Sequence, residues 1–249
     1  MNTKTENRFS LRDLGRRVRN RWTRAKTGQR AGLERLRTAH PWPDISALSG
    51  EPPYLWTLDG GGRHLIIDLI RQEKPKVFLE VGVFLGGSAL LWLEHSPRDM
   101  TLLAADSWHA AAQEWIIDMG RDPEPWITDL DLVRSLRDPL GEHGMFNVAM
   151  HNLRRFRDRV IPLRMPAADL YPHLKKFLDP DIIYIDANKE REDYFLAHEM
   201  FPSATLCGCD WEWADASGEC PVQDYVGEIA RIRRCEVIAE KCTWIIRSR

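Results

Sequence analysis

The sequence predicts an α/β fold: a doubly wound, mostly parallel sheet of seven strands with helices on both faces. Three observations lead to this prediction. From residue 76 onward, short apolar runs alternate with segments of helical periodicity. Most of these apolar runs are bounded by helical segments, which is how parallel strands are connected. The chain has 249 residues, 43% of them hydrophobic, which is enough for one large core without disulfides or metals.

Each element follows from its local pattern. Apolar and β-branched runs predict the strands, which we place at 76–81, 101–106, 159–163, 181–186, 204–209, 235–239 and 243–247. Apolar residues spaced by three and four predict the helices, which we place at 63–72, 87–94, 145–158, 167–178, 190–200 and 222–233. A tryptophan-rich, acidic stretch at 107–142 interrupts the alternation, and we interpret it as an insertion.

The first 40 residues differ sharply in charge from the rest. They hold 12 Lys and Arg against 3 Asp and Glu, whereas the remaining chain is acidic and the total is −2. Apolar residues at helical spacing predict a helix over 10–25 that ends near Gly28, followed by a short helix over 32–39. Prolines 41 and 43 then indicate an extended linker. We therefore divide the chain into a basic helical arm with its linker, 1–50, and a main domain, 51–249.

The basic arm permits three interpretations. It docks on the acidic body of its own or a neighbouring subunit, or it lies on an anionic membrane face through residues 8–26, or it contacts an anionic glycan or nucleic acid. Docking is favoured because the apolar stripe is short. Nucleic acid is disfavoured because no base-reading motif is present.

The cellular compartment is predicted from the cysteines and from the first ten residues. The five cysteines lie within the last 43 residues, and the first ten residues contain no apolar leader. We expect reduced, structural thiols in a cytoplasmic protein, with the inner membrane face as an alternative place of contact. The spacing of Cys207, Cys209 and Cys220 is a poor match to zinc motifs. No apolar run approaches the ~20 residues of a membrane span.

A glycine turn follows the first strand, and ligands of open α/β sheets bind at such strand ends. Gly82 is followed by three other residues before Gly86 and Gly87. This spacing is neither G-x-G-x-x-G nor a P-loop, so it argues against a row of phosphates. Glu80 ends the strand, where it would repel phosphate and attract an ammonium group. Asp106 ends the second strand, where a carboxylate can accept hydrogen bonds from ribose hydroxyls.

These residues resemble a known family. FLEVGVFLGGSALLW, residues 78–92, resembles motif I of class I S-adenosylmethionine-dependent methyltransferases. IPLRMPAADLYPHL, DIIYIDANKEREDY and FPSATLCGCDW fall where that family has its later strand ends, and CTWIIRS resembles the last strand of its antiparallel closing hairpin. The branch that contains macrolide-sugar O-methyltransferases and cephalosporin-type methyltransferases is most similar. The resemblance covers about residues 60–249.

The resemblance implies a cofactor, S-adenosylmethionine, and a role for each matching residue. The methionine part would be held by Glu80, Gly82, Gly86 and Ser88. Asp106 would bind the ribose, Met165 and Ala168 would flank the adenine, and Asp186 would face the acceptor.

The resemblance also implies Mg²⁺, and here the sequence departs from the family. In the metal-using members the position of Asp186 joins two adjacent aspartates, but this chain has Cys209 before Asp210. Magnesium prefers oxygen ligands, so the thiol should weaken the site. Asp186, Asp210 and Glu212 remain as candidate ligands. Lys189 stands where the family commonly has a histidine, and it could supply part of the positive charge.

We expect an enzyme that methylates a hydroxyl of a sugar or another polar secondary metabolite. Asp186 is the first candidate for the base that removes the hydroxyl proton, and His109 and His143 are second choices. Trp108, Trp115 and Trp126 of the insertion suit a sugar ring or a lid, or else pack against other parts of the protein. We expect a small-molecule acceptor, sugar-like or glycosylated, and a homo-oligomer such as a dimer.

Two other functions stay open. The first is an NAD-dependent oxidoreductase on a similar sheet, which the glycine spacing disfavours. The second is a non-catalytic adaptor that has the same fold. Cys209 is compatible with this alternative, because it departs from the pattern of the metal-using family members.

Overall fold

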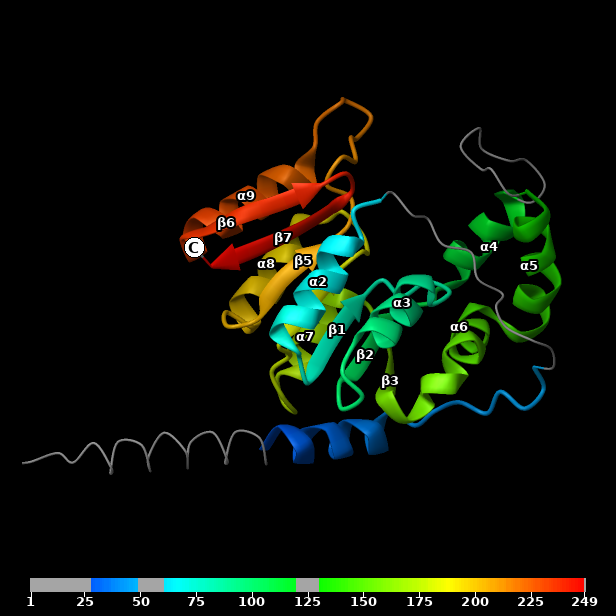
Figure 1. Cartoon of the computed structure of the whole chain (residues 1–249). Helices are drawn as coiled ribbons and strands as arrows, with labels where there is room; N and C mark the ends of the chain where they lie inside the picture. The colour runs from blue at the N-terminus through cyan, green and yellow to red at the C-terminus, as the bar shows by residue number, and fades with distance from the viewer. Residues whose placement is uncertain (1–27, 49–60, 120–129, 249) are drawn as a thin grey trace, which may run out of the picture.

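A computed structural model describes residues 28–48, 61–119 and 130–248 (Figure 1). Its centre is a seven-stranded sheet in the order β3-β2-β1-β4-β5-β7-β6. The strands are β1 (Val77–Val81), β2 (Thr101–Asp106), β3 (Val160–Arg164), β4 (Ile182–Ile185), β5 (Thr205–Gly208), β6 (Cys235–Glu240) and β7 (Thr243–Ser248). The first five pair in parallel, and β7 pairs antiparallel with both β5 and β6. The predicted fold class, including the antiparallel closing hairpin, is confirmed.

Helices cover both faces of this sheet (Figure 1). One face carries α2 (His64–Glu73), α3 (Gly87–His95), α6 (Met145–Leu153) and the outlying pair α4 (Ala110–Met119) and α5 (Leu130–His143). The other face carries α7 (Ala167–Leu174), α8 (Arg191–Met200) and α9 (Pro221–Arg233). A 3₁₀ turn, η1 (Arg154–Arg159), leads from α6 into β3.

Successive side chains of the central strands point to opposite faces of the sheet, which divides the core into two layers. In β1, Phe78 packs with the α2 and α3 side, whereas Leu79 and Val81 pack with the α7 to α9 side. All five residues of β1 are buried. A strand buried on both faces reads as a continuous apolar run, which is the pattern that predicted it.

The helix boundaries differ from the predicted ones in several places, one of them α7, which ends at Leu174 and not at residue 178. The insertion 107–142 contains two described helices, α4 and α5, with residues 120–129 outside the described part. The helix predicted over 145–158 is α only to Leu153, because the backbone of Phe156 leaves the helical region. The short helix predicted over 32–39 is longer than predicted, since residues 28–39 form one continuous helical segment. The helix predicted over 10–25 lies outside the described residues.

Residues 28–48 pack against the body. Leu36 is completely buried among the residues of the α7 to α9 side. Arg37 donates to the backbone carbonyls of Arg157, Asp158 and Val160, at 3.3, 2.9 and 3.2 Å. A Cβ on Gly32 would lie 2.2 Å from the carbonyl oxygen of Phe177, so this contact is close. The division of the chain at residue 50 stays a prediction, because 1–27 lie outside the described residues.

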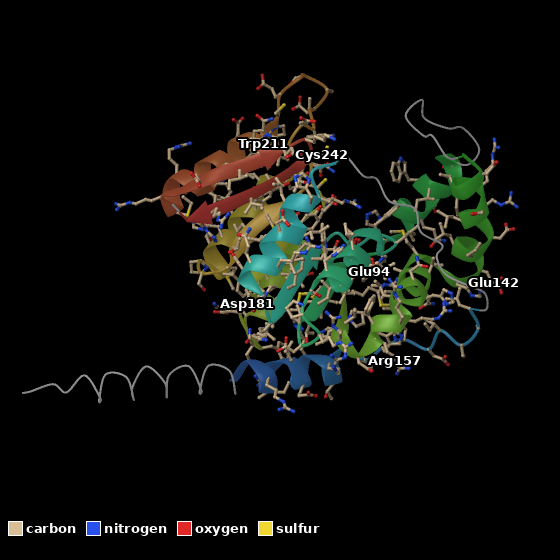
Figure 2. All side chains as sticks on the ribbon, in the orientation of Figure 1. Glu94, Glu142, Arg157, Asp181, Trp211 and Cys242 are labelled. Atoms are coloured by element: carbon tan, nitrogen blue, oxygen red, sulfur yellow. The ribbon has the colours of Figure 1, made fainter. Side chains whose placement is uncertain are left out.

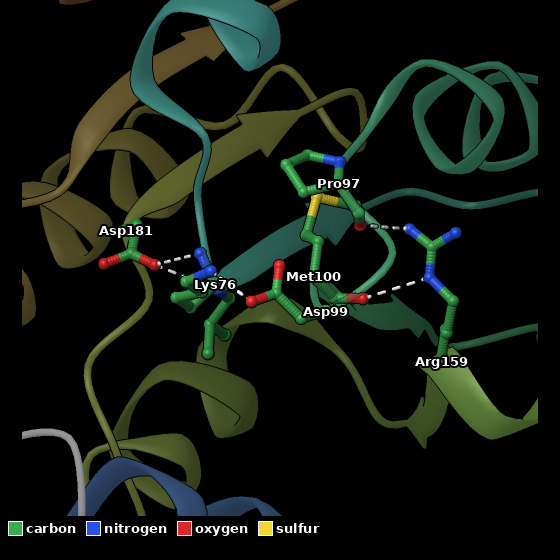
Figure 3. Close-up of polar contacts among 7 residues, drawn as sticks. Lys76, Pro97, Asp99, Met100, Arg159 and Asp181 are labelled. Atoms are coloured by element: carbon green, nitrogen blue, oxygen red, sulfur yellow. Dashed lines mark hydrogen bonds and ion pairs between the residues drawn. The ribbon is translucent and has the colours of Figure 1, made fainter.

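The amino-terminal ends of the strands form an edge that is closed by internal hydrogen bonds (Figure 3). The Asp181 carboxylate accepts from the backbone N–H groups of Lys76 and Val77, at 2.7 and 2.9 Å. The Lys76 ammonium pairs with Asp99. Arg159 donates to the carbonyl oxygens of Leu93, Pro97 and Met100 and to the hydroxyl of Ser96. Charged groups at this edge therefore have partners within the chain.

Two further observations concern compartment. All five cysteines are free thiols, and Cys207 and Cys209 are buried. In the part of the chain that the structure describes, no helix is both long and apolar enough to cross a membrane.

Candidate cofactor and acceptor site

The carboxyl-terminal ends of the parallel strands form the opposite edge, and a cavity of about 180 Å³ opens there. Its walls come from the ends of β1 and β2, from the loops after β1, β2, β3 and β4, and from residues of α4, α6, α7 and α8. Two larger cavities, of about 710 and 510 Å³, lie beneath residues 42–48 and beside the amino end of β5. Neither is lined by a predicted site residue, so the smaller cavity is the one that matches the chemistry.

Gly82 makes the turn after β1 possible. Its φ is +94°, and a Cβ there would lie 1.8 Å from the backbone oxygen of Asp186. Its N–H donates to the carbonyl of Ala105 at 2.9 Å. The ends of β1, β2 and β4 therefore meet at this residue, and only glycine fits. Gly86 also has a positive φ, +88°, and precedes α3. Gly82 lines the cavity and Gly86 does not.

Asp106 ties two cavity loops together. Its carboxylate accepts from the backbone N–H of Phe84 at 2.8 Å and from that of Trp108 at 2.7 Å. The Trp108 indole in turn donates to the carbonyl of Phe84 at 2.7 Å. Burial raises the pKa of Asp106, although these hydrogen bonds oppose the rise. Since a carboxylate has about four lone-pair sites, Asp106 can accept further hydrogen bonds from a ligand in the cavity.

Glu80 and Ser88 lie beneath the cavity rather than in its wall. Glu80 is completely buried, and one of its oxygens accepts a hydrogen bond from the Ser88 hydroxyl. Among the described residues its other oxygen has no hydrogen-bond partner. Burial raises the pKa of Glu80 to about 8, the Ser88 hydrogen bond opposes this, and the Asp186 charge adds to it. A role for Glu80 and Ser88 toward a cofactor stays a prediction.

Asp186 follows β4 and belongs to a compact acidic cluster. Side-chain ligand atoms of Asp186, Cys209 and Asp210 all lie within 4.8 Å of one another. Burial and the neighbouring Asp210 raise the pKa of Asp186 to about 7, while the positive charges of Lys189 and Arg63 lower it. A carboxyl group in this condition can both hold and release a proton near neutral pH.

The cluster does not fit magnesium. Cys209 contributes a thiol whose pKa is raised to about 12 by burial and by both aspartates. Mg²⁺ requires oxygen ligands in near-octahedral geometry, and a protonated thiol is no substitute. The Lys189 ammonium also pairs with Asp210, at 2.9 Å between Nζ and Oδ2. Glu212 is exposed and does not belong to the cluster.

The remaining predicted residues separate into two groups. Met165 and His109 line the cavity, and His109 is exposed at its mouth. Ala168 is exposed and outside the wall, which its neighbours Pro166 and Ala167 form instead. His143 ends α5, does not line the cavity, and lies 3.8 Å from the Glu142 carboxylate.

Sequence reasoning missed Asp193 and Arg63. Asp193 lines the cavity from the first turn of α8 with only 7% of its surface exposed. Burial, Glu190 and Glu192 raise its pKa to about 6. Arg63 directly precedes α2 and acts electrostatically on both Glu80 and Asp186. In the sequence Asp193 looks like any acid in a helix's first turn, and Arg63 lies 17 residues before Glu80, so neither carried a usable signal.

The far edge of the same region is built by β5 and the closing hairpin. Figure 2 shows Trp211 and Cys242 at the end of the molecule opposite Asp181. The Trp211 N–H donates to the carbonyl of Cys242 at 2.9 Å. The Trp244 indole donates to the carbonyl of Cys209 at 2.7 Å. These bonds fix the backbone from which Cys209 and Asp210 project.

Comparison with known proteins supports the fold. Neither models of known protein families nor curated proteins give a match to this chain. Cofactor-bound Rv0187 from MTB is similar in structure, with a TM-score of 0.54 and 15% identity over 90% of each chain. A candidate caffeoyl-CoA O-methyltransferase from Staphylococcus aureus has a TM-score of 0.51 and 15% identity, covering 87% of this chain and 97% of its own. A candidate O-methyltransferase from Klebsiella pneumoniae has a TM-score of 0.50 and 17% identity, covering 82% and 94%.

Proposed function

We propose that this protein is an S-adenosylmethionine-dependent O-methyltransferase. The observation that carries the proposal is the cavity at the carboxyl ends of β1 and β2, with Gly82 in its wall and the Asp106 carboxylate beside it. Similarly folded proteins whose names describe them as O-methyltransferases support it. The glycine spacing that argues against a dinucleotide is consistent with it.

In this proposal the cavity, of about 180 Å³, holds the ribose and adenine part of the cofactor. Asp106 accepts hydrogen bonds from the ribose hydroxyls, and Met165 with Ala167 flanks the adenine from the start of α7. Gly82 lets the ligand approach the backbone of β1 closely. When bound, S-adenosylmethionine supplies an activated methyl group; the protein aligns the acceptor with that group.

The acceptor would lie beside the acidic cluster. Asp186 precedes two residues of the cavity wall, Ala187 and Asn188, so it is the first candidate for the base that takes the hydroxyl proton. His109 is the second candidate, because it lines the cavity, whereas His143 does not.

A sugar or another polar metabolite is the proposed acceptor class. Trp213 is 39% exposed, and its ring lies 5.8 Å from Nζ of Lys189, so an aromatic face and polar groups occur together. Such a surface suits a sugar ring. Trp108 is buried against Phe146 and is not available for stacking. The homo-oligomer, the cytoplasmic location and the membrane contact through residues 8–26 stay proposals of the same kind.

Calorimetric titration with S-adenosylhomocysteine and, separately, with NADH tests the cofactor. We expect one equivalent of S-adenosylhomocysteine to bind and NADH not to bind. In Asp106→Ala the affinity should fall roughly 10- to 100-fold, because hydrogen bonds to a charged acceptor are lost.

Asp181→Ala is the matched control, since Asp181 also accepts from two backbone N–H groups but at the other edge of the sheet. Its affinity should stay within about twofold of wild type, because the residue is remote from the cavity. Binding of NADH without S-adenosylhomocysteine would replace the proposal with an oxidoreductase. Binding of neither ligand to the folded protein would favour a non-catalytic adaptor.

A further inference from the structure

The place where the sequence resemblance implies Mg²⁺ contains an unusual set of groups. Two carboxylates, Asp186 and Asp210, share it with the thiol of Cys209. Cys209 is only 7% exposed, and its carbonyl is held by the Trp244 indole. The backbone is therefore fixed so that the thiol stays beside the carboxylates. A cation that prefers oxygen ligands, such as Mg²⁺, could bind the two carboxylates but not the thiol.

A positive charge is already present in the same place. Nζ of Lys189 lies 2.9 Å from Oδ2 of Asp210, and the two side chains are 31% and 20% exposed. The Lys189 ammonium also lies 5.8 Å from the centre of the Trp213 ring. A partly buried ammonium between a carboxylate and an aromatic face is held by both of them. A divalent cation at Asp210 would have to displace it.

The negative charge of the other carboxylate, Asp186, is opposed by positive side chains of this protein. The positive charges of Lys189 and Arg63 both act on Asp186. Lys189 comes from the loop after β4 and Arg63 from the start of α2, so the two cations approach from different elements. The two cationic side chains therefore reduce the attraction that the two carboxylates can exert on a divalent ion.

We propose that the ammonium group of Lys189 takes the place of the divalent cation, so that this site works without a metal. The proposal rests on the proposed methyltransferase function for its chemical meaning. The ammonium would contact the acceptor hydroxyl and stabilise the negative charge that develops on its oxygen. A divalent cation commonly binds two adjacent oxygens of an acceptor as a chelate, whereas an ammonium group can stabilise a single hydroxyl oxygen through one of its remaining N–H groups. An acceptor of this site therefore does not require a second oxygen beside the methylated hydroxyl.

Titration of the metal alone into the full-length protein tests this without knowledge of the acceptor. Mg²⁺, Mn²⁺ and Zn²⁺ are added in separate calorimetric experiments to wild type and to the double variant Cys209→Asp/Lys189→Met. We expect no stoichiometric binding to wild type in the millimolar range. The double variant should bind Mn²⁺ about tenfold more tightly or better, because it has three carboxylates and no competing ammonium.

Lys175→Met is the matched control. Lys175 pairs with Asp179 at 2.8 Å on the surface, so its loss removes an equivalent charge away from the site. It should bind metal no better than wild type. Melting temperature and S-adenosylhomocysteine affinity of each variant establish that it is folded.

Two results would overturn the proposal. The first is stoichiometric binding of any of the three metals to wild type that Asp210→Ala abolishes. The second is a folded double variant that gains no affinity for Mn²⁺, because Cys209 and Lys189 would then not be what excludes the cation. The two proposals can also fail separately. If wild type binds neither metal nor S-adenosylhomocysteine and the double variant gains affinity for Mn²⁺, the proposed function is contradicted. The assignment of Lys189 to the place of the cation then still holds.

Discussion

The two edges of the central sheet use the same kinds of residue in opposite ways. At the amino edge the Asp99 carboxylate pairs with Lys76, which holds its pKa below the usual range, and Asp181 is satisfied by two backbone N–H groups (Figure 3). At the carboxyl edge burial raises the pKa of Glu80 to about 8, that of Asp186 to about 7 and that of Asp193 to about 6.

This difference separates structural carboxylates from candidate functional ones. Pairing at the amino edge stabilises the charged form and with it the fold, whereas burial at the carboxyl edge disfavours the charge. Groups whose pKa is shifted toward neutrality in a cavity are typical of functional sites. The edge with the cavity is also the edge where these three acids are buried, at a cost in stability when they are charged.

The largest effect on stability should come from Gly82→Ala, which disrupts the turn after β1 at the carboxyl edge of the sheet. The new Cβ would overlap the backbone oxygen of Asp186, and φ is +94°. We expect a loss of about 3 kcal/mol or more in the free energy of unfolding, measured with urea.

Gly227→Ala is its control, since a Cβ at Gly227, within α9, meets nothing within 4 Å. That change should stabilise the protein by about 0.5–1 kcal/mol. Equal effects of the two substitutions would show that the turn after β1 is not the strained element that its geometry indicates.

A second, intermediate effect concerns pH. The pKa of Glu80 is raised from 4.5 to about 8, so the folded protein keeps a proton that the unfolded chain loses. The contribution of Glu80 to stability is therefore complete below pH 4.5 and is lost as pH rises toward 8. Glu80→Gln should reduce the fall in unfolding free energy over this window by about 1 kcal/mol per pH unit, measured by urea unfolding at several pH values.

Asp99→Asn tests the amino edge in the same experiment. Because the pKa of Asp99 is lowered by Lys76, its contribution is present at neutral pH and fades in acid. Asp99→Asn should therefore leave the slope above pH 5 unchanged. A slope that Glu80→Gln does not alter would mean that Glu80 is ionised in the folded protein, against its burial.

The smallest effect separates the two histidines. His109 lines the cavity and acts on Asp106, whereas His143 lies outside it. His109→Ala should weaken S-adenosylhomocysteine binding by about threefold, and His143→Ala should leave it unchanged, in the same calorimetric assay. A larger effect of His143→Ala would place α5 closer to the ligand than the cavity indicates.

Much of the site could be predicted because it sits at strand ends. Gly82, Asp106 and Asp186 each follow an apolar run, and that position alone indicates the ligand-binding edge of a parallel sheet. Ala168 does not line the cavity, whereas its neighbours Pro166 and Ala167 do, because the start of the helix determines which side chains face the cavity. Glu212 was chosen for its residue type, and the turn after β5 leaves it exposed.

The order of strands and helices, the glycine turn and the acids at the strand ends could be predicted from local pattern, since periodicity and chain breaks are local properties. Which side chains meet depends on the folded arrangement of the whole chain. It buries Glu80 against Ser88, brings Asp193 into the cavity wall, packs residues 28–48 on the body and sets Lys189 against Asp210. Such contacts join residues far apart in the chain, and burial and charge balance exist only once the chain has folded.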